Sequence, residues 1–560
     1  MTVLHGPPLS EARGVGALTL GGLLAEVSAR YADHESLVFD DPLAGGATVR
    51  WTYAELDRRS DGVAAGLLAA GTEPGDRVGI LMGNRPEAVA ALFGAARAGA
   101  VAVPLSTFSS RPELQWTLGH AGVSVVLTQD RLLRRRFLDD LGGHPLRAVA
   151  VVGAGASGPE TPTGAQDWET FLAAGESVPA GRVEARAAAV TPDHPGVIIY
   201  SSGTTDHPKG MLHSHRAHAL QFWFQADVFG RSTGTRLWTA LPLFWTAGLD
   251  TALGPTLAAG GCWVMQETFE PGEALALMER ERVTEPYTLP HQTAALEEHP
   301  AWATTDLSSL RCVFGKSAFA RHPTVKGDPG WHMPVGYGLS ETCASFVTHH
   351  HDTPRELQRL SMGRLLPGGR LRVVDPGSGA SVGAGRDGEL TVAGPTLMEH
   401  YVGRTPEECF DAEGFFHTGD AGNYDEDGYV HWTGRLTEMI KTAGANVSPA
   451  ELEVQLRACP PVKLARVLGL PDARLGQMVV LCAVLKDGAR ATEEEIRTFL
   501  GQRVASYKVP KRILFFADGE IPMTGSDNKV RDAELLELVH ARLAGEPSAP
   551  SSPTGATREH

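Results

Sequence analysis

The stretch Tyr200-Ser-Ser-Gly-Thr-Thr-Asp-His-Pro-Lys-Gly210 decides the interpretation of this chain. It follows Gly196-Val-Ile-Ile-Tyr200, an apolar run typical of a buried strand. Four hydroxyl residues, two glycines and a lysine occupy eleven positions, and none of them is aliphatic. Small residues let backbone N–H groups approach phosphate oxygens, and Lys209 adds a mobile cation. The stretch predicts a polyphosphate-binding loop, and the alternative is an ordinary hydrophilic loop.

The sequence on either side of this loop predicts an α/β fold. Apolar segments flank a helical pattern at 86–98, which is a β-α-β arrangement and favours a parallel sheet covered by helices. The strands predicted before the loop are 77–82, 100–104, 124–128 and 148–152. After Gly368, strands joined by Asp/Gly turns predict a more antiparallel, β-rich subdomain; they are 370–374, 388–392 and 429–432. A final α+β region combines helices with strands, at 449–457, 478–485, 492–503 and 512–516.

Composition excludes several classes of protein. The 560 residues carry 50 Lys plus Arg against 66 Asp plus Glu, and this net charge of −16 argues against nucleic-acid binding. Six scattered cysteines form no C-x-x-C pair, which favours a reduced, cytoplasmic protein. The most apolar stretch, 88–105, is interrupted by Arg97, Gly and Pro, so we expect no membrane-spanning segment and no signal peptide.

The phosphate loop resembles the signature loop of the adenylate-forming superfamily, which includes acyl-CoA synthetases, luciferases and peptide-synthetase adenylation domains. Four further motifs of that superfamily follow in the expected order. They are 242–248 for the acyl pocket, 336–342 for adenine and magnesium, 416–420 for ribose, and 434–444 with 447–453 for the hinge. The resemblance therefore covers nearly the whole chain.

The resemblance implies a large, multi-subdomain N-terminal AMP-binding domain with parallel sheets plus a β-rich subdomain, and a smaller, mobile α+β C-terminal domain. Its boundaries are expected at 1–434 for the first domain, 435–438 for the hinge, 439–545 for the second and 546–560 for a disordered tail. It also implies a two-step reaction that uses ATP and Mg²⁺. A carboxylate forms an acyl-adenylate with release of pyrophosphate, and a thiol of coenzyme A, or of the phosphopantetheine on an acyl carrier protein, then displaces AMP.

The resemblance also assigns roles to individual residues. Glu341 would ligate magnesium, and Lys209, Glu341 and Lys529 would be catalytic. The residues assigned to the phosphates are Ser201, Ser202, Gly203, Thr204, Thr205, Lys209, Ser340 and Thr342. Those assigned to adenine and ribose are Gly315, Lys316, Ser317, Gly336, Tyr337, Gly338, Asp420 and Arg435. On the mobile domain, Lys441 and Gly444 would face the thiol channel, and Glu438 would be the hinge residue or else an exposed charge.

Two positions depart from the family pattern. Asp206 replaces a glycine in the phosphate loop, and we expect its carboxylate to point away from the phosphates because like charges repel. The segment 522–529 is one residue longer than usual before Lys529 and lacks the adjacent glycine. Lys529 is the only lysine after Lys511, so it keeps the catalytic assignment.

The acyl-pocket motif indicates the kind of acid. The pocket residues expected are Trp245, Gly248, Leu249, Asp250, Gly338, Cys343 and Ala344. Trp245 stands where amino-acid-activating domains place an Asp, and an indole offers no counter-charge, which favours an apolar small-molecule carboxylic acid, with a fatty tail, a ring or a polycycle, over an α-amino acid. Core packing is the alternative for Trp245. Asp250 either binds a substrate hydroxyl or lies on a solvated face.

Together these features predict an acyl- or aryl-CoA synthetase. The alternatives are a stand-alone ligase that loads a carrier-protein thiol, a luciferase-like oxygenase, or a non-catalytic adenylate-binding relative.

Overall fold

The structure is a computed structural model that describes residues 2–153, 164–201, 208–313, 317–326, 333–436, 439–442, 445–472, 475–504, 508–523 and 530–545. The chain divides into two compact units. Unit 1 comprises Met1–Thr418 and Asn423–His431, and unit 2 comprises Gly419–Gly422 and Trp432–His560. Each unit is described by itself below.

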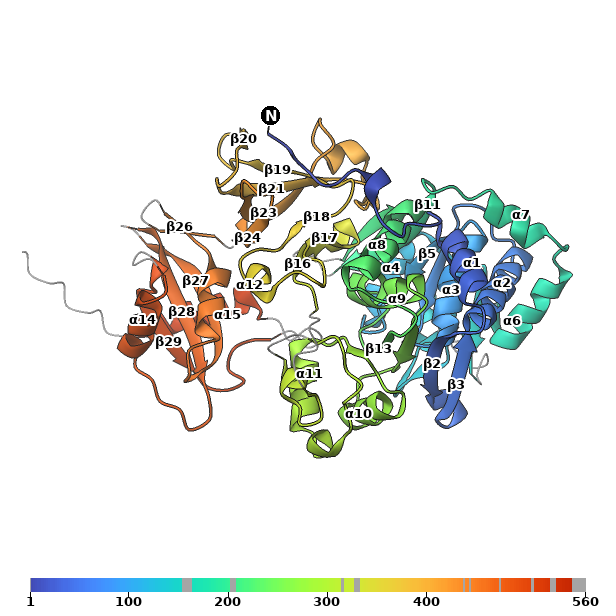
Figure 1. Ribbon diagram of the computed structural model, residues 1–560, viewed down its shortest axis with the longest axis horizontal. Helices are drawn as coiled ribbons and strands as arrows, with labels where there is room; N and C mark the ends of the chain where they lie inside the picture. The colour runs from blue at the N-terminus through green and yellow to red at the C-terminus, as the bar shows by residue number, and fades with distance from the viewer. Residues whose placement is uncertain are drawn as a thin grey trace, which may run out of the picture. The chain divides into compact units, whose positions relative to one another are not determined.

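An eight-stranded sheet in unit 1 carries the strand that precedes the phosphate loop (Figure 1). Its strands from β10 to β11 are parallel to their neighbours, whereas β12 and β22 are added in antiparallel fashion. In spatial order the strands are β10 (Ala165–Asp167), β9 (Ala148–Val152), β6 (Val123–Gln129), β4 (Arg77–Leu81), β5 (Val101–Pro104), β11 (Pro195–Ser201), β12 (Lys209–Ser214) and β22 (His400–Tyr401).

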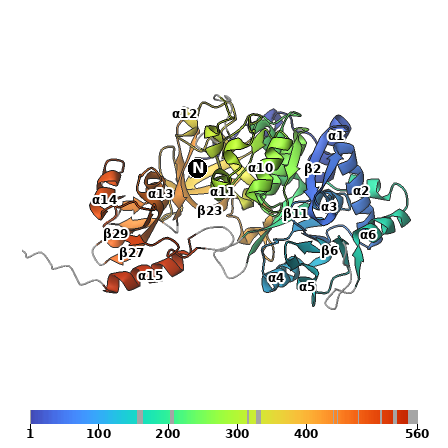
Figure 2. The ribbon, with the colours of Figure 1, turned by 90° about the horizontal axis from the view of Figure 1, so that it is seen from below.

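Helices cover both faces of this sheet. Side chains of α4 (Arg111–Ala121) and α5 (Leu138–Leu141) join one hydrophobic core with the sheet. In Figure 2, α2 (Tyr53–Ala69) and α3 (Pro86–Arg97) lie on the opposite side from α4 and α5. The predicted β-α-β arrangement is therefore confirmed, and Pro86 begins the helix because a proline needs no N–H partner at that position. Arg97, which interrupted the apolar run, ends α3 and forms ion pairs with Asp57 and Asp61.

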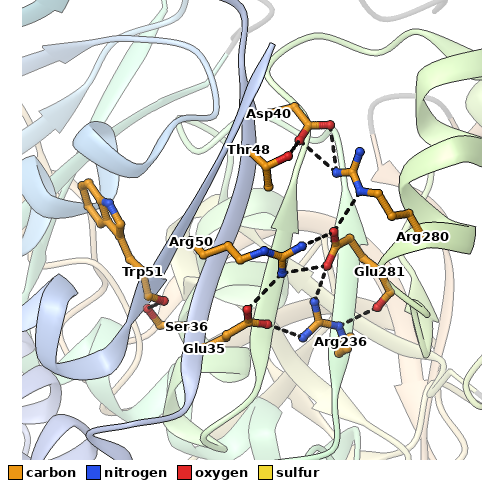
Figure 3. A network of polar contacts seen from close by, with 9 residues as sticks. All are labelled: Glu35, Ser36, Asp40, Thr48, Arg50, Trp51, Arg236, Arg280 and Glu281. Atoms are coloured by element: carbon orange, nitrogen blue, oxygen red, sulfur yellow. Dashed lines mark hydrogen bonds and ion pairs between the residues drawn. The ribbon is translucent and has the colours of Figure 1, made fainter. Parts of the chain in front are cut away.

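A second sheet in unit 1 is held by a cluster of charges. Figure 3 shows Arg50, Arg236 and Arg280 around the carboxylate of Glu281, with Glu35 bridging the first two arginines. Arg236 lies on one strand of the sheet, and Glu35 and Arg50 lie on two strands farther along it. The cluster therefore joins these strands to the end of α10 (Pro271–Arg280). In spatial order the strands are β15 (Glu285–Pro286), β13 (Arg236–Thr239), β14 (Cys262–Met265), β2 (Glu35–Asp41) and β3 (Ala47–Thr52).

The β-rich subdomain predicted after residue 368 is present. The strand predicted at 370–374 matches β19, and its antiparallel partner β21 extends the predicted 388–392 by one residue. The sheet contains β1 (Leu4–His5), β19 (Arg370–Val374), β20 (Ser381–Val382), β21 (Gly388–Ala393), β23 (Phe416–Tyr424) and β24 (Val430–Arg435). A separate antiparallel sheet contains β16 (Gly336–Leu339), β17 (Ala344–Thr348) and β18 (Arg364–Leu365).

Unit 1 is completed by further helices and one small hairpin. The helices are α1 (Leu20–Tyr31), α6 (Trp168–Ala174), α7 (Arg182–Ala188), α8 (His215–Val228), α9 (Gly254–Ala258), α11 (Pro290–Glu298) and α12 (Arg355–Gln358). The hairpin pairs β7 (Arg131–Leu132) with β8 (Arg135–Arg136). Within the described residues, no helix of either unit is both long and apolar enough to cross a membrane.

Unit 2 is built around one strand that is buried on both faces. Along β28, Val479, Leu481 and Ala483 join one core with α13 and α14, while Val480 and Cys482 alternate with them into a second core against α15. Figure 1 shows this sheet between α14 and α15. The elements are β25 (Ile440–Thr442), β26 (Ala445–Val447), α13 (Pro449–Leu456), β27 (Val462–Asp472), β28 (Gly476–Leu485), α14 (Glu493–Gly501), β29 (Arg512–Phe516) and α15 (Asp532–Gly545).

Candidate active site

The predicted phosphate-binding stretch connects the two strands of an antiparallel hairpin. Strand β11 ends at Ser201 and β12 begins at Lys209, and these two residues are paired across the hairpin. The connection leaves the carboxyl end of β11, which is the edge of an α/β sheet where ligands bind. The remaining predicted phosphate residues, Ser202, Gly203, Thr204 and Thr205, lie with Asp206 outside the described residues.

Tyr401 lies between the two predicted catalytic residues of unit 1. Its hydroxyl donates a hydrogen bond of 2.7 Å to Oε1 of Glu341, and Nζ of Lys209 lies 5.6 Å from the centre of its ring. Tyr401 occupies this place because β22 pairs with β12, which sets Tyr401 opposite Met211. Burial, together with the neighbouring carboxylate, raises the pKa of Tyr401, so the phenol stays protonated as a donor. The sequence reasoning missed Tyr401, because nothing in its spacing links it to residues 60 and 192 positions away.

The turn around Glu341 is unusually tight. Any side chain at Gly338 would overlap the carbonyl oxygen of Ala344, so the two strands β16 and β17 approach through a glycine. The hydroxyl of Thr342 is buried and bonds to the backbone of Leu339 and Ala344. Cys343 and Ala344 have φ of 54° and 80°, a left-handed conformation that costs free energy for residues with side chains. Thr342 thus supports the turn that presents Ser340 and Glu341.

Other predicted adenine-binding residues are only partly described. Gly336 and Tyr337 lie on β16, where the ring of Tyr337 is buried. Ser317 precedes a short helical turn at Ala318–Arg321. Gly315 and Lys316 lie outside the described residues.

Asp420 and Arg435 form an ion pair within unit 2. The carboxylate of Asp420 is 2% exposed and lies 3.1 Å from Nε of Arg435, whose side chain is 45% exposed. A buried carboxylate fixed by an arginine is suited to accept hydrogen bonds from two hydroxyls of a sugar. Of the other residues predicted for the C-terminal domain and its hinge, Lys441 lies on β25, and Glu438, Gly444 and Lys529 lie outside the described residues.

The predicted acyl-pocket motif places an indole among other aromatic rings. The ring of Trp245 is half-buried and lies 5.8 Å from Phe244 and 6.0 Å from Phe108, centre to centre. Phe108 is 54% exposed although it is a large apolar side chain. Gly248 is buried against the carbonyl of Pro242, where a side chain would overlap. An exposed aromatic group that continues into a partly buried indole offers an apolar surface for a ligand.

Asp250 is fully buried, so the alternative of a solvated face is wrong. It lies with Leu249 in a π-helix, η4 (Ala247–Leu253), a rare conformation often found at functional sites. Its Oδ1 is 2.6 Å from Nδ1 of His218. Burial raises the pKa of Asp250, and the nearby imidazole opposes this effect.

The predicted pocket residue Cys343 meets another histidine that the sequence reasoning missed. Its Sγ lies 3.1 Å from Nδ1 of His213. Both groups are completely buried, which raises the pKa of the thiol and lowers that of the imidazole. His213 and His218 come from β12 and α8, directly after the predicted phosphate loop, but no pattern in the sequence indicates that they converge with residues 250 and 343.

Comparison with known proteins gives the same family throughout. The AMP-binding enzyme family model matches residues 24–402, and the model of the AMP-binding enzyme C-terminal domain matches residues 451–528. A feruloyl-CoA synthase of Amycolatopsis sp is 34% identical over 85% of this chain and 91% of its own length. The indoleacetate–CoA ligase of Aromatoleum aromaticum is 33% identical over 87% and 93%.

Solved structures agree with these relatives. The anthranilate CoA ligase AuaEII, in complex with anthranoyl-AMP, has a TM-score of 0.77 at 25% identity, covering 94% of this chain and 98% of that one. Apo MatB from Rhodopseudomonas palustris has a TM-score of 0.71 at 28% identity, covering 92% and 98%. The chain therefore belongs to the AMP-binding enzyme family, and it is an adenylate-forming ligase of the acyl-CoA synthetase type.

Proposed function

We propose that this ligase activates an apolar, ring-bearing carboxylic acid with ATP and Mg²⁺ and transfers the acyl group to coenzyme A. The observation that carries the reaction type is the placement of Lys209 and Glu341 on either side of Tyr401, at the carboxyl edge of the eight-stranded sheet. Two anions, a carboxylate and a triphosphate, must meet for adenylation. A cation near the phosphates and an oriented carboxylate for a divalent ion are what that encounter requires.

Tyr401 would orient the carboxylate of Glu341 through its hydrogen bond. The phenol occupies one lone pair of Oε1, so the carboxylate cannot rotate freely, and its remaining lone pairs are oxygen donors of the kind that Mg²⁺ prefers. Bound magnesium would neutralise phosphate charge. Lys209, with Ser201 and the loop residues 202–205, would hold the phosphates that leave as pyrophosphate. Thr342 serves in this proposal by supporting the turn, while Ser340 lies toward the α-phosphate.

The ribose and the second half-reaction are assigned to unit 2 and its hinge. Asp420 would accept hydrogen bonds from the two ribose hydroxyls, and Arg435 holds the carboxylate of Asp420 in place. In the proposed domain alternation about Glu438, one pose delivers Lys529 to the carboxylate and α-phosphate. The other brings Lys441 and Gly444 to the thiol channel.

The proposed acid class rests on the aromatic surface at the acyl-pocket motif. Trp245, Phe244 and Phe108 provide rings without a counter-charge for an ammonium group, which disfavours α-amino acids. The names of the relatives point the same way, because ferulate, indoleacetate and anthranilate are all aromatic acids.

A carboxylate-dependent pyrophosphate-exchange assay tests the proposal. The acids are a hydroxycinnamate, indoleacetate, anthranilate, a medium-chain fatty acid and phenylalanine, each with ATP and Mg²⁺. We expect exchange with at least one aromatic acid, no exchange with phenylalanine, and loss of exchange in Glu341→Gln. Exchange with phenylalanine alone would contradict the proposed acid class.

The thiol acceptor is tested separately on the best acid. Coenzyme A and a phosphopantetheinylated carrier protein are supplied in parallel, and AMP release is measured. We expect turnover with coenzyme A. Turnover with the carrier protein but not with coenzyme A would contradict the proposed acceptor and identify the carrier-protein thiol as the acceptor.

A further inference from the structure

Four buried side chains from separate elements converge beneath the turn that carries Glu341. They are His213 of β12, His218 of α8, Asp250 of the π-helix η4, and Cys343 at the left-handed position after Thr342. All four side chains are essentially inaccessible to solvent. His213, His218 and Cys343 can each offer one metal-binding atom, and these three atoms lie within 4.8 Å of one another.

The hydrogen bonds of this cluster are incomplete. Nε2 of His213, Nε2 of His218 and Oδ2 of Asp250 are buried and have no hydrogen-bond partner. Buried polar atoms without partners are rare, and each costs about 1–3 kcal/mol. Two of these three atoms, the Nε2 atoms of His213 and His218, are imidazole nitrogens that can bind a metal ion.

The orientation of His218 fits that of a metal ligand. Its Nδ1 is held by Asp250 at 2.6 Å, which leaves Nε2 as the atom that is available to an ion. A carboxylate behind a histidine is the usual outer partner of zinc-binding imidazoles, because it fixes the tautomer and raises the basicity of the ring. Sγ of Cys343 lies 3.1 Å from Nδ1 of His213, so the thiol contacts this imidazole, and Nε2 is the atom of His213 that has no partner and is available to an ion.

Charge also favours an ion in this cluster. An isolated carboxylate is costly to bury, and the groups of this cluster that interact with Asp250 are the imidazole of His218 and the thiol of Cys343. A divalent ion bound by the Cys343 thiolate and two neutral imidazoles would carry one net positive charge, which the Asp250 carboxylate balances. Nitrogen and sulfur ligands select zinc rather than magnesium.

Two of the backbone segments that carry the cluster have uncommon conformations. Asp250 lies in a π-helix, and Cys343 and the following Ala344 have positive φ. Such conformations persist where the surroundings fix them, and they cluster at functional sites. No cavity is required for an ion, since the ligand atoms themselves enclose it.

We propose that His213, His218 and Cys343 bind a zinc ion, with Asp250 orienting His218 and balancing the charge. The ion is distinct from the magnesium proposed at Glu341, because its ligands are nitrogen and sulfur. It joins β12, α8 and the Glu341 turn into one rigid unit.

The test is metal analysis of untagged full-length protein, grown with added zinc and purified without chelators. We expect about one zinc per chain in the unaltered protein and at least a tenfold lower content in Cys343→Ser and His218→Gln. Cys312→Ser is the matched control, because Cys312 is equally buried but lies in a different hydrophobic cluster. Asp250→Asn should weaken zinc affinity by about 10–100-fold without abolishing binding.

A second measurement keeps the test decisive if the variants fold poorly. Chelator-treated unaltered protein is titrated with Co²⁺, and the near-ultraviolet thiolate-to-cobalt charge-transfer band is recorded. We expect the band at one equivalent of Co²⁺, and its loss when zinc is added. Zinc content near zero in the unaltered protein together with no cobalt–thiolate band would overturn the proposal, as would zinc content unchanged in Cys343→Ser.

Discussion

Replacing Glu281 by Gln should destabilise unit 1 through the charge cluster that joins β2–β3 to β13 and α10. The side chain of Glu281 is 3% exposed. Its two oxygens accept four hydrogen bonds from three arginines, at 2.6 and 3.1 Å from Arg50, 2.7 Å from Arg236 and 3.0 Å from Arg280 (Figure 3). Glutamine keeps the shape, removes the charge and turns an N–H₂ group toward a guanidinium.

The magnitude follows from the exposure of the three partners. Arg50 and Arg280 are 44% and 45% exposed and can return to water, so their contacts count as surface pairs of about 0.5 kcal/mol each. Arg236 is 24% exposed, and its charge-assisted bond is worth about 1.5–2 kcal/mol. The loss of stability is then about 2.5–3 kcal/mol. With an unfolding entropy of ~2.1 cal/mol/K per residue over the roughly 430 residues of unit 1, this lowers Tm by about 3 °C.

The assay is thermal unfolding of the full chain, followed by tryptophan fluorescence, at pH values from 8 to 4. Burial works to raise the pKa of Glu281, but the hydrogen bonds and charges of Arg50, Arg280 and Arg236 outweigh it and hold the pKa below its usual range. A lowered carboxyl pKa contributes stability above the unfolded value of about 4.3 and loses it as the pH falls through the folded value. The difference in Tm between Glu281→Gln and the unaltered protein should therefore be constant from pH 8 to about 5 and shrink below about pH 4.

Glu297→Gln is the matched control, because its ion pair with Arg321 is exposed on both sides. It should change Tm by less than about 0.5 °C. The reasoning is refuted if Glu281→Gln behaves like this control at pH 7, or if its difference from the unaltered protein grows as the pH is lowered.

Three further predictions concern the site. Tyr401→Phe removes the hydrogen bond to Glu341 and should raise the Mg²⁺ concentration for half-maximal pyrophosphate exchange about tenfold, whereas an unchanged requirement would contradict the orienting role. Gly338→Ala forces a side chain into a backbone carbonyl and should cost at least about 3 kcal/mol of stability in thermal or urea unfolding. Gly234→Ala, where there is space, serves as its control. Lys529→Ala should abolish adenylation but spare thioester formation from a supplied acyl-adenylate, and equal loss of both half-reactions would remove its assignment.

The fold was predictable where periodicity and burial agree. The β4–α3–β5 segment was predicted to within one residue at each end, because strands buried on both faces and a helix buried on nearly all sides are continuous apolar runs that turn residues separate. The long strand β27 was missed, although it pairs along most of β28. It contains Gly469 and Pro471 and alternates poorly, and its burial depends on its partner strand rather than on its own pattern.

The site was predictable only as far as its motifs reach. Glu341 and Asp420 were assigned from short segments in which the neighbouring residues carry the information, and these assignments stay predictions. Tyr401 and His218 make their contacts with residues far away in the chain, and no local pattern marks them. The π-helix around Asp250 could not be expected either, because the extra residue in its turn follows from tertiary packing.

The pairing of β22 with β12 has a consequence for how the protein is made. The hairpin of β11 and β12 is complete once residue 214 has left the ribosome, but the strand that covers its edge comes almost 190 residues later. Until then β12 presents an unpaired edge to other nascent chains, and unpaired edges promote aggregation. The ring that separates Lys209 from Glu341 also arrives with that strand, so a chain released before residue 401 holds the signature loop but not the assembled site.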